Sequence, residues 1–112
     1  MAFTPFLYFD GTAEAAMTFY ARLFGATDLE VMRFSDAPEG SDMGGSDRVM
    51  YSQLTINGHT LGAWDFPPGM TAVPQASVSV GHEVADFAEG ERIYNALSEG
   101  GEQTMPFGAT FF

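Results

Sequence analysis

Hydrophobic and polar positions recur with two different periods along this chain, and these periods predict its helices and strands. Apolar side chains recur at helical spacing in residues 12–24 and 88–98, and glycine soon follows each stretch. Glycine just past the last turn is a common helix stop. Alternation with period two, or enrichment in β-branched and aromatic residues, predicts strands over residues 3–9, 28–34, 48–56, 59–66, 75–81 and 102–105.

Turn residues separate these elements and mark one boundary between two modules. Asn57-Gly58 lies between two alternating stretches and is a strong hairpin signal. Residues 35–47 are rich in Gly, Ser, Asp and Pro, lack periodicity and are predicted to form a mobile loop. We predict one α+β domain at 1–112, with a βαβββ module at 1–66, a Pro/Gly linker at 67–74 and a second module at 75–112 that lacks its last two strands.

Composition and charge exclude several classes of partner. The chain has 112 residues, no cysteine, four Lys+Arg and fifteen Asp+Glu, and its formal net charge is −11. Nucleic acids and anionic membrane surfaces are bound by clustered basic residues, whereas these arginines are scattered singly. Without cysteine there is no disulfide, thiolate zinc site or cysteine nucleophile. We also find no basic leader and no apolar run of about 18 residues, so we expect a cytoplasmic protein.

Short motifs in order along the chain resemble a known superfamily. They are PFLYFDG at 5–11, FY at 19–20, LFGA at 23–26, INGH at 56–59, WD at 64–65, ALSEGG at 96–101 and TMPFG at 104–108. Together they resemble the vicinal oxygen chelate superfamily, the glyoxalase/bleomycin-resistance/dioxygenase fold, and within it the PhnB-like branch. The resemblance implies paired βαβββ modules that face each other around a pocket. Because isomerases, dioxygenases and non-catalytic drug-binding proteins share this fold, it implies no single activity.

The resemblance also implies where a metal or cofactor would bind. Metalloenzymes of the superfamily place His, Glu or Gln on the first and fourth strands of one unit and on matching strands of the other. Here Asp65 and Gln75 are the weak candidates, and a closed site needs about three protein ligands. The PhnB-like branch is often labelled a demethylubiquinone methyltransferase, but no strand ends in a Gly-rich turn suited to a nucleotide-like cofactor. We therefore expect no metal and no other cofactor.

Several aromatic and polar side chains on the predicted strands are candidates for lining a pocket. Tyr8, Tyr51 and Trp64 suit the lining of a cup and suit core packing equally well. His59 beside the hairpin turn and His82 beside Glu83 are more typical of exposed loops than of a catalytic pair. The sequence leaves catalytic residues unassigned. The candidates for the ligand pocket are Tyr8, Tyr51, Trp64, Asp65, Gln75 and Ser77.

Three functions remain as hypotheses. The first is a PhnB-like homodimer that binds an unidentified small molecule in a cupped aromatic pocket without a metal, either as an enzyme or as a sequestering protein. The second is a divalent-metal-dependent isomerase or dioxygenase, which Asp65 and Gln75 would serve. The third is a non-catalytic interaction module in which two copies exchange strands, because an incomplete second module leaves unpaired strand edges.

Overall fold

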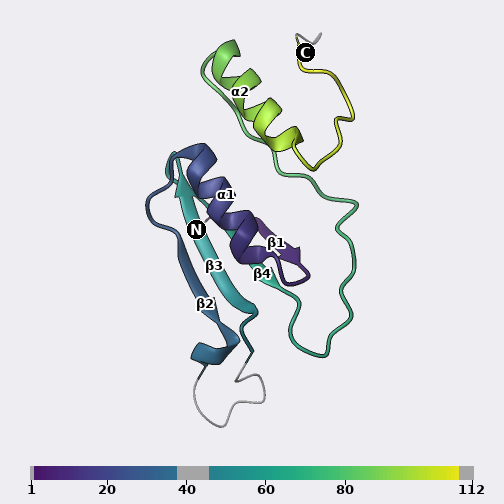
Figure 1. Cartoon of the computed structure of the whole chain (residues 1–112). Helices are drawn as coiled ribbons and strands as arrows, with labels where there is room; N and C mark the ends of the chain where they lie inside the picture. Colours follow the sequence, from purple (N-terminus) through teal and green to yellow (C-terminus); the bar gives the residue numbers. More distant parts are fainter. Residues whose placement is uncertain (1, 38–45, 109–112) are drawn as a thin grey trace. The chain divides into compact units, whose positions relative to one another are not determined.

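The computed structural model describes residues 2–37 and 46–108 (Figure 1). The described chain divides into two compact units, Met1–Ser79 (unit 1) and Val80–Phe112 (unit 2). Neither helix has the length and apolar character needed to cross a membrane, in the part of the chain that the structure describes. The elements in order are β1 (Phe6–Phe9), α1 (Ala13–Phe24), β2 (Glu30–Arg33), a short 3₁₀ helix η1 (Phe34–Asp36), β3 (Val49–Ile56), β4 (His59–Asp65) and α2 (Phe87–Ser98).

Unit 1 is a four-stranded sheet with α1 against one face (Figure 1). The strand order is β1-β4-β3-β2, where β1 pairs with β4 in parallel and the other neighbours are antiparallel. Asn57 and Gly58 join β3 to β4 with φ of 50° and 79°. Two successive positive φ angles are what a type I′ hairpin requires, so the Asn-Gly signal predicted this turn. The β-α-β-β-β order of the first module is confirmed.

The core of unit 1 forms where α1 meets the sheet. Ala13 and Met17 of α1 are fully buried against Leu54 of β3 and Ala63 of β4. The helix ends at Gly25, whose φ of 75° lies in the left-handed region that glycine tolerates. Because this packing buries one face of the sheet, the side chains on the other face are left for other contacts.

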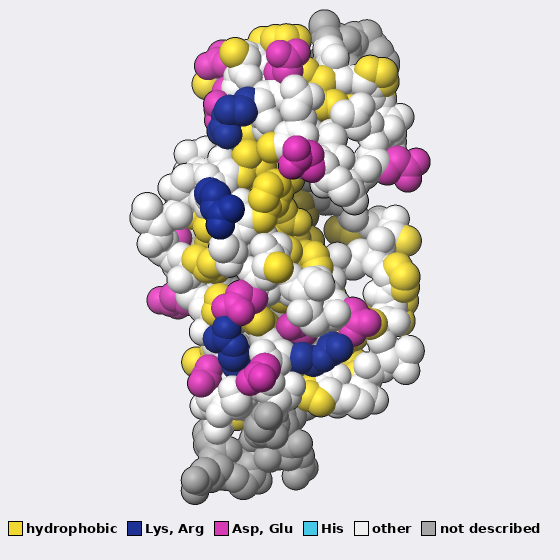
Figure 2. Space-filling model, in the orientation of Figure 1, with side chains coloured by type: hydrophobic (Ala, Val, Ile, Leu, Met, Phe, Trp, Pro, Cys, Tyr) yellow, Lys and Arg dark blue, Asp and Glu magenta, His cyan; other side chains and the backbone are white. Residues whose placement is uncertain are grey.

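Two ion pairs join elements of unit 1. Arg33 at the end of β2 pairs with Glu14 in the first turn of α1, and Arg48 before β3 pairs with Asp10 after β1. Figure 2, in the orientation of Figure 1, shows dark blue arginine side chains lying among magenta carboxylates. Pairs as exposed as these contribute little to stability, because solvent screens the attraction between the two charges.

Unit 2 contains α2 and a following segment that folds back on it. The Asp86 side chain caps the helix by accepting the Glu89 N–H at 2.8 Å. The ring of Phe107 packs between Phe87 and Tyr94, with ring centroids 4.8 and 5.5 Å apart. It approaches the helix at Gly90, where a Cβ atom would lie 3.0 Å from the Phe107 ring. The tight approach therefore depends on a residue without a side chain.

Two predicted strands are wrong. Residues 75–81 and 102–105 form no strand in the structure. At the first of these, the contact with the sheet is made by a side chain, Gln75, rather than by a main-chain ladder. At the second, the chain returns along α2 through the Phe107 ring and a hydrogen bond from the Tyr94 hydroxyl to the Met105 carbonyl. Alternation makes a strand only where a neighbouring strand supplies hydrogen-bond partners.

Some predictions lie outside what the structure tests. Most of the predicted loop at 35–47 and the last residues of the second module, 109–112, lie outside the described residues. The α+β class is confirmed, and so are both helices, within one residue at each end of the predicted ranges. The module boundaries at 66 and 75 remain a prediction.

Candidate functional site

The alternation of side chains along each strand sorts the sheet of unit 1 into two faces. Leu7 and Phe9 of β1, Leu54 of β3 and Ala63 of β4 lie on the face covered by α1. Successive strand residues point to opposite faces, so their neighbours in sequence point away from α1. We call the rings on this second side the aromatic face; its members are Phe6, Tyr8, Tyr51, Trp64 and Phe66.

The five rings of the aromatic face form one continuous row. The ring centroids of successive members are 6.0 Å apart for Tyr51 and Phe6, 5.0 Å for Phe6 and Trp64, and 5.1 Å for Trp64 and Tyr8. Tyr8 and Phe66 close the row at 5.1 Å. These spacings lie in the favourable range for aromatic pairs. Tyr8 is 38% exposed, so the row presents apolar surface to solvent in unit 1.

Gly62 on β4 is what allows this row to form. It is the parallel partner of Phe6 on β1, and a Cβ atom built there would overlap the Cε1 and Cδ1 atoms of the Phe6 ring. The Phe6 ring therefore passes close over Gly62 and reaches the rings of both Trp64 and Tyr51. Sequence reasoning missed Phe6, Gly62 and Phe66 as site residues. A glycine inside a strand is nevertheless a general signal of close approach.

Polar groups border the row at two points. The indole Nε1 of Trp64 is buried and has no hydrogen-bond partner among the described residues. The Tyr51 hydroxyl donates to Oε1 of Gln53, and Nε2 of Gln53 lies 3.4 Å from Oε2 of Glu30. An unpaired buried N–H costs free energy until an acceptor reaches it. The Trp64 indole N–H is therefore an unsatisfied donor beneath the surface of the row.

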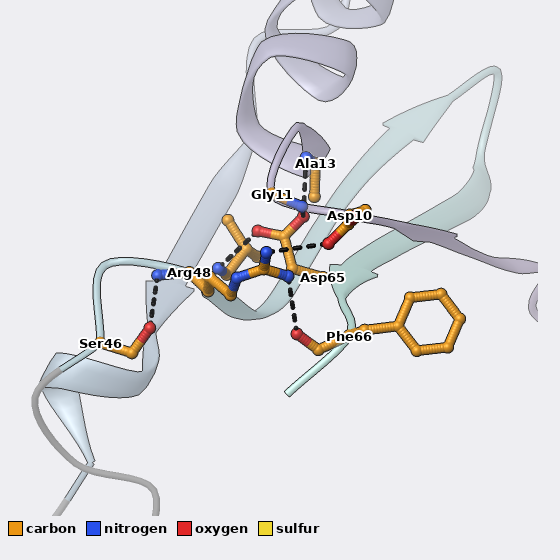
Figure 3. A network of polar contacts seen from close by, with 8 residues as sticks. Asp10, Gly11, Ala13, Ser46, Arg48, Asp65 and Phe66 are labelled. Carbon is orange, nitrogen blue, oxygen red and sulfur yellow. Dashed lines mark hydrogen bonds and ion pairs between the residues drawn. The ribbon is translucent and has the colours of Figure 1, made fainter. Parts of the chain in front are cut away.

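Asp65 lies on the opposite side of the sheet from the aromatic face and joins three segments of the chain. Its Oδ1 accepts the N–H groups of Gly11 at 2.9 Å and Ala13 at 3.0 Å, and its Oδ2 accepts the Val49 N–H at 2.8 Å (Figure 3). The residue is only 3% exposed. Hydrogen bonds to an ionised carboxylate are among the strong ones. Asp65 thus fixes the start of α1, where the Thr12 side chain at the N-cap position makes no capping bond.

Arg48 holds the end of β4 beside this network. Its guanidinium donates to Asp10 at 2.8 Å and to the main-chain carbonyl of Phe66 at 3.1 Å. Figure 3 shows the guanidinium between these two groups, while the Phe66 ring points away from it. The contact to the carbonyl fixes the main chain where the last ring of the aromatic face is attached.

Gln75 and Ser77 come from the segment that follows the sheet. Oε1 of Gln75 accepts the Tyr8 N–H at 3.1 Å, on the edge of β1 that faces away from β4. Ser77 lies two residues further along and is exposed. Of the predicted pocket residues, the structure brings together Tyr8, Tyr51 and Trp64, with Gln75 at the edge beside Tyr8. The Asp65 carboxylate faces the α1 side instead.

Comparison with known proteins identifies relatives of the whole chain. A family model described as 3-demethylubiquinone-9 3-methyltransferase matches residues 1–110. Among solved structures, the chain is similar to protein PA1353 from Pseudomonas aeruginosa, at 36% identity over 99% of this chain and 82% of that one, with a TM-score of 0.87. It is also similar to a putative 3-demethylubiquinone-9 3-methyltransferase, PhnB protein, from Bacillus cereus, at 26% identity over 99% and 84%, with a TM-score of 0.63. Proteins of curated function gave no match.

The description of the matching model implies a methyl donor, and the residues present do not fit a nucleotide-like one. Such a group is held by free main-chain N–H groups where a strand turns into a helix. In this chain that turn is Gly11 to Ala13, and both N–H groups already bond to Asp65. The same bonds engage Asp65 with main-chain donors rather than a metal. Within residues 2–37 and 46–108, no three His, Cys, Asp or Glu side chains cluster to hold a metal ion.

Proposed function

The chain belongs to the 3-demethylubiquinone-9 3-methyltransferase family of PhnB-like proteins, and on that premise we propose that it binds a small molecule on its aromatic face. The row of five rings is the observation that carries the proposal. The resemblance to the vicinal oxygen chelate superfamily supports it, because members of that superfamily bind small molecules between paired βαβββ modules. The activity named in the family's description is not part of the proposal.

The composition of the aromatic face favours a ligand with a flat apolar part. Stacking or edge contacts between rings are worth about 0.5–1.5 kcal/mol beyond the burial of their area. The rings of Tyr8 and Trp64 offer such contacts, and the Tyr51 hydroxyl and the Gln53 amide are polar groups at the border of the row. Few polar groups set among apolar ones are typical of small-molecule sites.

We propose that the protein acts as a homodimer, with strand exchange between copies as one way to form it. β1 is an edge strand of the sheet in unit 1, and its outer edge includes the Tyr8 N–H that Gln75 accepts. Edge strands offer main-chain groups to another chain. A cytoplasmic location agrees with a chain that has no cysteine. Light scattering at micromolar concentration tests this part, and a strictly monomeric mass would refute it.

Fluorescence tests the binding proposal because Trp64 is the chain's single tryptophan and lies inside the ring row. Titration with a panel of flat metabolite-like compounds is expected to yield at least one saturable change in Trp64 emission. Replacing Tyr8 by Ala should weaken that binding about tenfold, which corresponds to the loss of a ring contact of about 1.4 kcal/mol.

The matched control is Phe19→Ala. Phe19 is an aromatic side chain of similar exposure, 36% against 38% for Tyr8, but it lies on α1. This variant should bind as the unaltered protein does. If no compound changes the emission, or if Tyr8→Ala and Phe19→Ala behave alike, the aromatic face is not the binding site.

A further inference from the structure

The charges around the aromatic face are strongly one-sided. The chain contains no lysine, and its net charge is −11. Of the three arginines in unit 1, Arg33 and Arg48 each pair with a carboxylate, and Arg22 lies in the last turn of α1, which covers the other face of the sheet. Among the side chains that alternate onto the aromatic side of β1–β4, the one charged residue is Glu30.

The negative charge of Glu30 is linked to the ring row. The Gln53 amide lies between them: its Nε2 group donates a hydrogen bond to Glu30, and its Oε1 atom accepts one from the Tyr51 hydroxyl. This arrangement leaves the lone pairs of the Tyr51 oxygen for a positive group. The faces of Tyr51 and its neighbours in the row are themselves electronegative, because aromatic rings carry a negative charge density above their planes.

The segment at the other border of the row adds no positive charge. Residues 66–81 contain no charged side chain, and Gln75 of this segment bonds to Tyr8. A cation near Tyr8 or Trp64 therefore meets ring faces, and no arginine or lysine lies on the aromatic side of the four strands. Arg48 bonds to the Phe66 carbonyl at this end of the row, but its charge is balanced by Asp10. Glu30 lies beyond Tyr51 and Phe6 at the other end of the row, so it acts on the cation as a more distant negative charge. Attraction of a cation to tyrosine or tryptophan rings strengthens when water is excluded.

From this charge pattern we propose that the ligand of the aromatic face is a positively charged organic molecule, with an aromatic or methylated ammonium head that lies on the rings of Tyr8 and Trp64. The inference rests on the proposed binding function and specifies the chemical class of the ligand. An anion of the same shape is repelled by Glu30 and by the field of the whole chain. An uncharged molecule gains the apolar contacts alone.

Three probes of nearly equal shape separate these cases: phenyltrimethylammonium, uncharged tert-butylbenzene and the anion 4-tert-butylbenzoate. Each is titrated at low ionic strength with Trp64 emission as the signal. The cation is expected to bind at least about tenfold more tightly than the uncharged probe, and the anion more weakly still. Added salt should reduce the affinity for the cation and leave that for the uncharged probe unchanged.

Variants assign the preference to named groups. Glu30→Gln keeps an acceptor for Gln53 but removes the charge, and it should reduce the cation's advantage over the uncharged probe several-fold. Tyr8→Leu keeps apolar bulk but removes the ring, so it should also reduce the cation's advantage over the uncharged probe. Tyr8→Phe keeps the ring and should retain that advantage. Phe19→Leu on α1 is the matched control and should change nothing.

The failures of the two proposals are distinguishable. Equal binding of cation and uncharged probe, or tighter binding of the anion, overturns the inference about charge and leaves binding at the aromatic face intact. A preference for the cation that survives both Glu30→Gln and Tyr8→Leu also overturns it. If none of the three probes and no compound of the wider panel changes Trp64 emission, both proposals fail together.

Discussion

Two residues of β4, three positions apart, organise the opposite faces of the sheet. Gly62 leaves room for the Phe6 ring on the aromatic face, and Asp65 gathers three main-chain N–H groups on the side of α1. Both effects depend on partners that are distant in sequence. Alternation alone therefore predicts which side Tyr8 and Trp64 face, but it predicts neither the ring that lies over Gly62 nor the donors that surround Asp65.

Replacing Gly62 by Ala should destabilise the protein by about 1–3 kcal/mol, because the added methyl group and the Phe6 ring cannot share the same space. The free energy of unfolding in urea measures this loss, and Trp64 emission should shift because Phe6 stacks on its indole. Gly81→Ala is the control, since a Cβ atom there meets nothing within 4 Å. Adding Phe6→Ala should relieve the overlap; an undiminished penalty in the double variant would show that the overlap is not the cause.

Replacing Asp65 by Asn should cost about 2–4 kcal/mol in the free energy of unfolding. The amide keeps the shape but loses the charge, and its NH₂ group would face an N–H donor that the carboxylate oxygen now accepts. Asp10→Asn is the matched control: its carboxylate is 66% exposed in the pair with Arg48, so about 1 kcal/mol or less is expected. Equal losses in urea unfolding for the two variants would contradict the structural role of Asp65.

The elements were predictable wherever their determinants are local. Both helices, the Asn57-Gly58 turn and the two strands it joins follow from periodicity and stop signals within about ten residues. Residues 75–81 show the limit of this reasoning: the sequence alternates there, yet the Tyr8 N–H is met by the Gln75 side chain and no ladder forms. A strand is defined by pairing, and local sequence does not contain the partner.

Asp28, in the connection between α1 and β2, should make the stability of the fold depend on pH. Asp28 accepts the Thr55 N–H at 2.9 Å, and its hydrogen bonding to Thr55, through the side chain and the main chain, lowers the pKa of this carboxyl below its ordinary value of 3.8. A lowered pKa in the folded state means that the contribution to stability is present above 3.8 and is lost as pH falls through the lowered value.

The melting temperature of the unaltered protein, compared with that of Asp28→Asn between pH 7 and acid pH, tests this dependence. The advantage of the unaltered protein should be constant at neutral pH and should shrink only below the ordinary pKa of 3.8. Glu102→Gln, in which the altered side chain is exposed and lies outside unit 1, serves as the control. An advantage that persists unchanged at the acid end would contradict the role of the Asp28 carboxylate.

At the scale of the whole molecule, the net charge is the property that follows most directly from the sequence. A net charge of −11 on 112 residues means that carboxylates outnumber basic side chains, and pairs such as Arg33–Glu14 and Arg48–Asp10 engage only a few of them. The family and its βαβββ module could also be predicted, since the motifs run along most of the chain. The division near Ser79 could not, because it depends on contacts between elements rather than on composition.

Salt should stabilise this protein. Raising sodium chloride from about 20 mM to about 300 mM shortens the screening length severalfold and weakens repulsion between carboxylates. We expect the melting temperature to rise by a few degrees, whereas a protein held mainly by surface ion pairs would lose stability. Sucrose at equal osmolality separates screening from a general solvent effect. An unchanged or lower melting temperature in salt would contradict net repulsion as the dominant electrostatic effect.

The single hydrogen bond from Tyr8 to Gln75 has a consequence for the exchange of main-chain hydrogens with solvent. The N–H groups of Gly62 and Phe66 bond to carbonyls of the neighbouring strand, so deuterium replaces them only when strands separate. The Tyr8 N–H is shielded by one flexible amide, and rotation of that side chain is enough to release it. Its exchange rate would therefore report how often the Gln75 side chain leaves the edge of β1 while the sheet beneath stays intact.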